Sequence, residues 1–135
     1  MSRHVVVGVG LSSSATAAEL AGLVDETLRR AGLSRGDVAV LATRHRFEHD
    51  ARLGLGVPVV GVDDHELVEA SEPPARARGI QSRVAETAAG LVAQRWSAAR
   101  GGSHAVVGAG RSAHATAAIA IASSSSDELA PEARP

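Results

Sequence analysis

Cysteine is absent from the 135 residues, so the chain can form no disulfide, no thiolate metal site and no cysteine nucleophile. Aromatic residues are nearly absent, since Phe47 and Trp96 are the only ones. Lysine is missing too, and 14 arginines against 15 acidic residues leave a net charge of −1. Without a basic surface or a set of stacking aromatics, we expect no binding to nucleic acid or to a membrane surface.

A long apolar run is missing as well. The N-terminus enters a strand-like segment directly, without the charged and then apolar regions of a signal peptide. The longest stretch free of acidic residues, residues 100–126, contains arginine, histidines and many small polar residues, which excludes a membrane span. We therefore expect a cytoplasmic protein, with one domain whose core is built mainly from alanine and valine.

What the chain does contain is a repeat at its two ends. The segment VVGVGLSSSATAA (residues 6–18) returns as VVGAGRSAHATAA (residues 106–118), and most positions are identical. Each copy is typical of a short strand covered on both faces, followed by a loop with glycines and serine hydroxyls. In the first copy, Thr16 and Glu19 fit a capping box, which predicts a helix start with free amides facing the loop.

Glycine loops and helix starts attract phosphate and carboxylate groups, so the two copies predict one anion-binding edge built from both ends of the chain. The alternative is that the glycines only make tight turns between the layers of an α/β fold. A dinucleotide site is not indicated, because the third glycine of that fingerprint is missing.

The remaining pattern predicts a single three-layer α/β/α domain with a mainly parallel, mixed sheet of about five strands. Ligands collect at the carboxyl ends of the strands in such sheets. Residues 1–122 are expected to form the domain and residues 123–135 a disordered tail. The expected strands cover residues 5–7, 37–43, 56–62, 104–107 and 115–122; the expected helices cover residues 16–31, 65–70 and 82–99; residues 44–55 and 71–79 are expected as polar connections.

Arginines and histidines follow the second expected strand. Arg44, Arg46 and Arg52 lie there, and together with Arg111 of the second repeat they are expected to surround the same mouth as the serines. The alternative is that they are ordinary exposed arginines. Residues 45–49 fit the H-x-x-E-H pattern of inverted zinc peptidases, but they follow a strand directly and lack a third ligand, so we predict no metal site.

The order of these segments resembles the family of CobE and the C-terminal domain of CbiG, proteins of cobalamin (vitamin B12) biosynthesis. Five segments carry the resemblance: VVVGVG with the AAEL helix start, VAVLAT, LGVPVVGVDDHEL, GIQSRVAETAAGLVA and GRSAHATAAIAIA. The chain departs from the family pattern in its first loop, where residues 11–14 read LSSS in place of C-R-R-G. Residues 43–50 also differ from the usual segment, and Arg111 alone represents the lysines of the last loop.

The resemblance implies binding of a corrinoid or precorrin intermediate, a large apolar ring fringed with carboxylates, without any further cofactor. Other enzymes of the pathway are candidate partners. Two alternatives are a hydrolase acting on the lactone of cobalt-precorrin-5A, with His45, His49 or His114 as base, and an interaction subunit that binds no small molecule. The candidate ligand-binding residues are Gly8, Gly10, Ser12, Ser13, Ser14, Thr43, Arg44, His45, Gly110, Arg111, Ser112 and His114.

Overall fold

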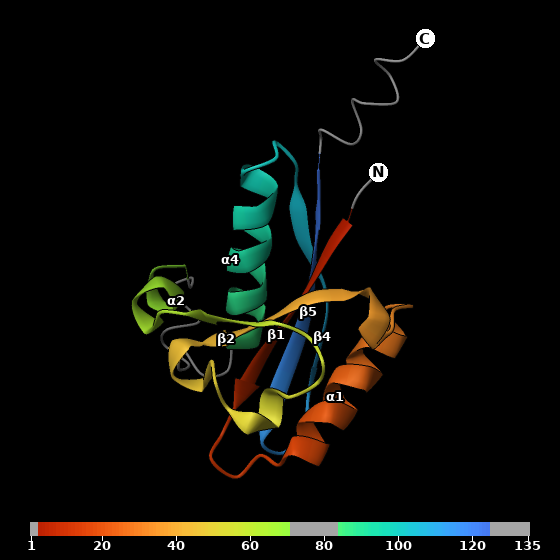
Figure 1. Cartoon of the computed structure of the whole chain (residues 1–135), viewed down its shortest axis with the longest axis vertical. Helices are drawn as coiled ribbons and strands as arrows, with labels where there is room; N and C mark the ends of the chain where they lie inside the picture. Colours follow the sequence, from red (N-terminus) through yellow and green to blue (C-terminus); the bar gives the residue numbers. More distant parts are fainter. Residues whose placement is uncertain (1–2, 71–83, 125–135) are drawn as a thin grey trace.

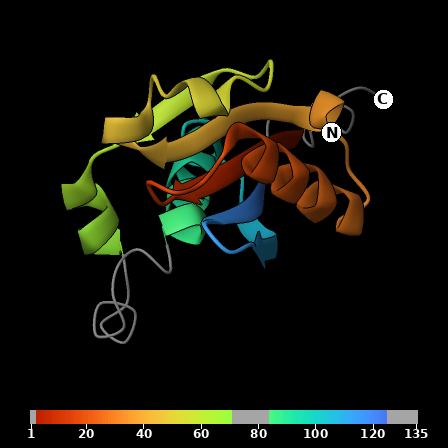
Figure 2. The same ribbon diagram turned by 90° about the horizontal axis from the view of Figure 1, so that it is seen from below.

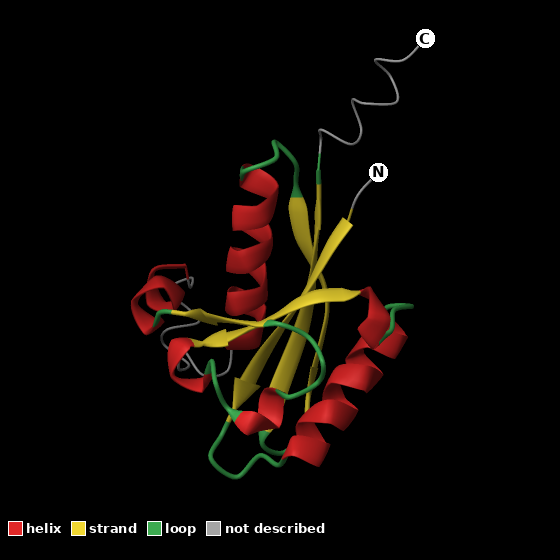
Figure 3. Cartoon of the chain, viewed as in Figure 1, coloured by secondary structure: helices red, strands yellow, loops and turns green. Residues whose placement is uncertain are grey.

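The computed structural model describes residues 3–70 and 84–124. Its elements are the strands β1 (Arg3–Leu11), β2 (Val38–Arg44), β3 (Val59–Val62), β4 (His104–Arg111) and β5 (Ala115–Ser123), the helices α1 (Ala17–Arg30), α2 (Asp64–Ala70) and α4 (Val84–Ala98), and the 3-10 turns η1 (Arg35–Asp37), η2 (His45–Phe47) and η3 (Ala51–Leu53) (Figure 3). The expected connection over residues 71–79 lies outside the described residues. So does most of the expected tail, but β5 runs one residue into it, to Ser123.

The five strands form one mixed sheet in the order β3-β2-β1-β5-β4. The first three strands are parallel to one another, whereas β5 is antiparallel to both of its neighbours. As a result β4 runs in the same direction as β1. The loops of the two repeat copies therefore lie at the same end of the sheet, where β1 and β4 finish.

Helices cover both faces of this sheet, with α4 on one side and α1 on the other (Figure 1), which confirms the predicted three-layer α/β architecture. The alternation of side chains along a strand divides the valines of β1 between the two layers. Val5, Val7 and Val9 pack with the leucines of α1, whereas Val6 packs with the alanines of α4.

The strands β1 and β4 are longer than the sequence predicted, because the repeat glycines continue them instead of ending them. Gly8 and Gly10 have no positive φ and pair with β5 in regular register. A Cβ added at Gly8 would lie 1.9 Å from the carbonyl oxygen of Ala85 in α4. Gly8 therefore lets the helix backbone approach the strand closely, and the expectation that it belongs to a ligand loop is wrong.

The strand β4 differs from the prediction in its exposure. Val106 and Val107 are 44% and 49% exposed, although the sequence favoured a strand covered on both faces. The reason is the strand order, which places β4 at the edge of the sheet. The register shift between Val106 and Gly108 further distorts this edge.

A stack of three side chains lies at the amino-terminal end of β1, far along the strand from the repeat loops. The rings of His4 and Trp96 are parallel, with centroids 4.6 Å apart, and the guanidinium of Arg100 covers Trp96 at 4.3 Å. Burial, and secondarily the positive charge of Arg100, lower the pKa of His4 below its usual value of 6.5.

This stack predicts a pH dependence of stability. Because the pKa of His4 is lower in the folded chain, the unfolded chain takes up a proton first as the pH falls through about 6.5. The free energy of unfolding should therefore decrease from pH 8 to pH 5.5. Urea unfolding followed by circular dichroism measures it, and the His4→Gln variant should lose that part of the slope. An equal slope in both proteins would exclude His4 as its source.

Candidate functional site

A cavity of about 560 Å³ opens where β1, β2 and β4 end. Figure 2, seen from this end, shows the loop after β1 lying between β2 and the β4–β5 hairpin. Both copies of the sequence repeat therefore contribute to one cavity. The residues that line it are Gly10, Leu11, Ser12, Ser13, Arg44, Arg46, Phe47, Val84, Arg111, Ser112, Ala113, His114, Ala115 and Thr116.

The floor of the cavity is a row of residues across four adjacent strands. Thr116 of β5 pairs with Gly10 of β1 on one side and with Arg111 of β4 on the other. Directly paired residues place their side chains on the same face of a sheet, here the face that α4 covers. Gly8 pairs with Ala42, and two residues further along β2 the same face carries Arg44. The row thus ends in Arg44 on one side and Arg111 on the other. Their backbones are about 14 Å apart, because three strand spacings of about 4.8 Å separate β2 from β4.

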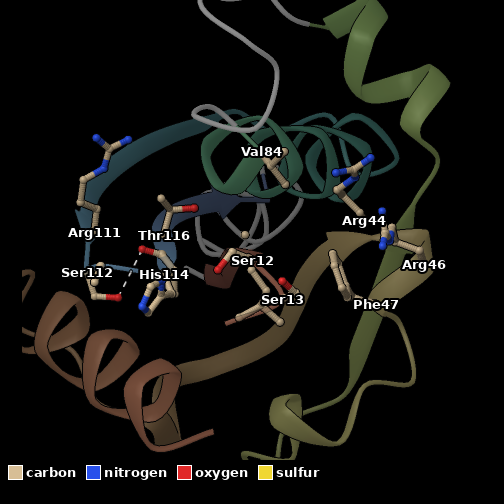
Figure 4. Close-up of a pocket in the computed structure, with 14 residues that line it drawn as sticks. Ser12, Ser13, Arg44, Arg46, Phe47, Val84, Arg111, Ser112, His114 and Thr116 are labelled. Carbon is tan, nitrogen blue, oxygen red and sulfur yellow. Dashed lines mark hydrogen bonds between the residues drawn. The ribbon is translucent and has the colours of Figure 1, made fainter. Parts of the chain in front are cut away.

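The arginines on the two sides of the cavity differ in their partners (Figure 4). Arg44 makes two hydrogen bonds of 2.9 Å to the carboxylate of Asp64, and these lower the pKa of that carboxyl. Arg46 lies over the ring of Phe47, at 4.9 Å from its centroid. Within the described parts of the chain, neither Arg46 nor Arg111 forms an ion pair with an acidic side chain. Both can therefore bind an anionic ligand group without breaking an existing pair.

Glu19 holds the β4–β5 hairpin in place. Its carboxylate accepts a hydrogen bond from the hydroxyl of Ser112 and one of 2.8 Å from the backbone N–H of His114. These two bonds lower the pKa of Glu19, the Ser112 hydroxyl most of all. The predicted capping box is therefore half formed: Thr16 accepts from the N–H of Glu19, but the Glu19 side chain turns to the hairpin.

The loop after β1 is fixed from two sides. The N–H of Ser12 donates to the carbonyl oxygen of His114 at 3.0 Å, which joins the two repeat loops directly. Arg52 donates to the carbonyl oxygens of Ser12 and Ala15, and its other nitrogens pair with Asp50. The expectation that Arg52 surrounds the mouth of the cavity is thus wrong, because its guanidinium binds the backbone of the loop and does not line the cavity.

Seven of the twelve candidate residues line the cavity, and five do not. The seven are Gly10, Ser12, Ser13, Arg44, Arg111, Ser112 and His114. Of the others, Gly8 contacts α4 as described above, and Ser14 instead donates its N–H to the Ser12 hydroxyl at 3.3 Å. Thr43 is fully buried, and its hydroxyl donates to the carbonyl oxygen of Val9. Thr43 is therefore a core residue.

The last two candidates, Gly110 and His45, are not part of the lining of this cavity, although Gly110 lines a smaller one of about 250 Å³. Gly110 faces α1, where an added Cβ would lie 2.7 Å from the hydroxyl of Thr27. His45 pairs with Glu48 at 3.0 Å on the exposed turn η2, outside the cavity lining. In the described ranges, no three histidine or acidic side chains are close enough together to hold a metal ion.

Several lining residues were missed by the sequence analysis. Phe47, Val84 and Thr116 come from three different elements, and only the fold brings them together. Arg46 was expected at the mouth with the other arginines, although it was not among the twelve candidate ligand-binding residues, and it does line the cavity. For Thr116 a signal did exist, because it repeats Thr16 one hundred residues later, in a copy where no helix follows.

Fold and cavity together define a class: a three-layer α/β domain with an arginine- and serine-lined cavity at the carboxyl ends of its strands. The family model described as "Cobalamin synthesis G C-terminus" matches residues 5–120. The chain therefore belongs to this family of cobalamin biosynthesis proteins, as its resemblance to CobE and the CbiG C-terminal domain indicated.

Two solved structures share the fold. CobE, from the cobalamin (vitamin B12) biosynthetic pathway, matches with a TM-score of 0.72 and 23% identity, over 90% of this chain and 92% of its own. A putative cobalamin biosynthesis protein G homolog from Sulfolobus solfataricus matches with a TM-score of 0.62 and 20% identity, over 90% of this chain and 37% of its own. The search of curated proteins gave no match. None of the described helices has the length and apolar character needed to cross a membrane.

Proposed function

We propose that this protein binds a carboxylate-bearing corrinoid intermediate of cobalamin biosynthesis in the strand-end cavity. The observation that carries the proposal is the pair of arginines, Arg46 and Arg111, which lie on opposite sides of the cavity without acidic partners among the described residues. Membership of the cobalamin synthesis family supports the choice of ligand.

The chemistry of the lining suits such a ligand. Corrin intermediates are wide apolar rings with acetate and propionate groups around their edge. Arginine forms paired, charge-assisted hydrogen bonds with carboxylates, and the serine hydroxyls of the two loops can add further donors. Between these polar groups the cavity offers apolar surface from Phe47, Val84 and Ala115, against which a ring can pack.

The direct test is a titration followed by the visible absorption of the ligand, with gel filtration to detect a co-migrating chromophore. The proposal predicts micromolar binding of hydrogenobyrinic acid, which carries free carboxylates. Cobinamide, whose side chains are amidated, should bind at least about 10-fold more weakly, because it cannot form the charged hydrogen bonds. Equal binding of both would refute carboxylate recognition, and binding of neither would refute the proposed function.

The same experiment separates binding from catalysis. A hydrolase would convert a lactone-bearing intermediate, and the absorption spectrum of the mixture would change with time. Of the three histidines considered as bases, His114 alone is among the residues that line the cavity. We expect a stoichiometric complex whose spectrum is stable.

A further inference from the structure

One buried polar atom stands out in the described part of the chain. The hydroxyl oxygen of Thr116 is buried and has no hydrogen-bond partner there, and it is the one side-chain nitrogen or oxygen atom in that condition. Buried polar groups in folded proteins are nearly always hydrogen-bonded, since an unmet hydroxyl lowers stability. An exception in the wall of a cavity therefore calls for an explanation.

The sequence repeat shows why the hydroxyl lacks a partner. In the first copy, Thr16 begins α1, and its hydroxyl accepts a hydrogen bond of 3.0 Å from the N–H of Glu19. In the second copy the chain continues as β5, so Thr116 lies in a strand with no helix amide to bind. The same residue type is thus satisfied in one copy and unsatisfied in the other.

The surroundings of Thr116 place it at the centre of the cavity floor. Its neighbour in β1 is Gly10, where an added Cβ would lie 2.6 Å from the Thr116 hydroxyl oxygen. Its neighbour in β4 is Arg111, on the same face of the sheet. Thr116 also lines a second cavity of about 250 Å³, which shares Arg111 with the first and is lined by Glu86 as well.

We propose that Thr116 is a ligand-binding residue whose hydroxyl donates a hydrogen bond to the same carboxylate that Arg111 binds. Thr116 as a whole residue is only partly buried, so a rotation about χ1 can bring its hydroxyl from the Gly10 side to the cavity surface. A carboxylate oxygen placed there accepts from Thr116 and Arg111 together, because the two residues are direct cross-strand neighbours. The chemical class of ligand is an anion with a carboxylate at the edge of a flat apolar body.

This inference rests on the proposed function and predicts opposite effects on stability and on affinity. In the Thr116→Val variant a methyl group replaces the hydroxyl at nearly the same volume, so the unsatisfied group is removed. Its melting temperature should rise by a few degrees, while its affinity for hydrogenobyrinic acid falls about 10-fold. The matched control, Thr116→Ser, retains the hydroxyl and should bind within about threefold of the unmodified protein.

The outcomes are distinguishable. If Thr116→Val binds as tightly as the unmodified protein, the inference is wrong, while the proposed function stands as long as that protein binds the acid. A melting temperature that falls on Thr116→Val would also contradict the inference, because the hydroxyl would then have a partner in the free protein. If the unmodified protein does not bind hydrogenobyrinic acid, the proposed function fails, and the inference fails with it.

Discussion

Alanine in place of Gly8 is expected to lower the free energy of unfolding by about 3 kcal/mol. The added methyl group would lie 1.9 Å from the carbonyl oxygen of Ala85 and 2.9 Å from the Cβ of Ala89. Both contacts are with the backbone or the shortest side chain of α4, so no flexible group can move aside. The helix must shift away from β1, and its small alanines then lose their contacts with the sheet.

Gly22 offers a matched control for this substitution. It lies within α1, and no atom is within 4 Å of a Cβ added there. Alanine at this position should stabilise the protein by about 0.5–1 kcal/mol, because it lowers the entropy cost of forming the helix. Urea unfolding followed by circular dichroism measures both variants. If Gly8→Ala unfolds at the same urea concentration as the unmodified protein, this result would contradict the close packing of the α4 backbone against Gly8.

Glutamate in place of Arg111 is expected to weaken the binding of hydrogenobyrinic acid about 100-fold. The substitution removes charge-assisted hydrogen bonds, each contributing about 1.5–3 kcal/mol, and adds repulsion between two carboxylates. Arg111 is exposed at the end of β4 and forms no ion pair with the described residues, so the fold should tolerate the change. An absorption titration gives the affinity, and an unchanged melting temperature shows that the fold is intact.

The control for charge is Arg29→Glu. Arg29 is exposed in the last turn of α1 and does not line the cavity, yet its substitution changes the net charge by the same amount. Its affinity should stay within about twofold of the unmodified protein, since exposed charges are screened by salt beyond about 10 Å. Equal losses in the two variants would mean that net charge, and no specific contact of Arg111, determines binding.

Much of this fold was predictable from the sequence because its elements have strong local signals. Thr16 and the apolar spacing after it mark the start of α1, and Gly32, with φ of 77°, ends it as expected. The repeat also predicted correctly that the loops of its two copies lie together at one end of the sheet. That prediction depends on β1 and β4 running in the same direction, which follows from the insertion of β5 between them.

The errors concern properties that only tertiary packing decides. A G-x-G segment after an apolar run can form a loop, or it can continue a strand under a closely packed helix. Gly8 does the latter because α4 consists largely of alanine on that side, and a local pattern does not show which helix will cover it. The exposure of Val106 and Val107 likewise follows from the edge position of β4, which pattern alone does not reveal.

For the candidate site too, the sequence indicated which residue types are present but not which neighbours each side chain contacts. The sequence indicated arginines after the second strand, but it did not separate Arg46, which reaches the cavity, from Arg52, which supports the first loop through two carbonyl oxygens. Thr43 was assigned to the ligand site as the last residue of the second expected strand, yet its hydroxyl donates to the carbonyl oxygen of Val9 within the core. Each of these roles depends on which neighbouring group lies within hydrogen-bond distance in the folded chain.

The proposed function depends on where the ligand binds, and amide chemical-shift mapping by NMR tests this most directly. On addition of hydrogenobyrinic acid to the labelled protein, the largest shifts should fall on Ser12, Ser13 and residues 111–116. The amides near His4 and Trp96, at the other end of β1, should not change. Shifts concentrated around His4 and Trp96, or along the exposed valines of β4, would contradict the assignment of the cavity as the binding site.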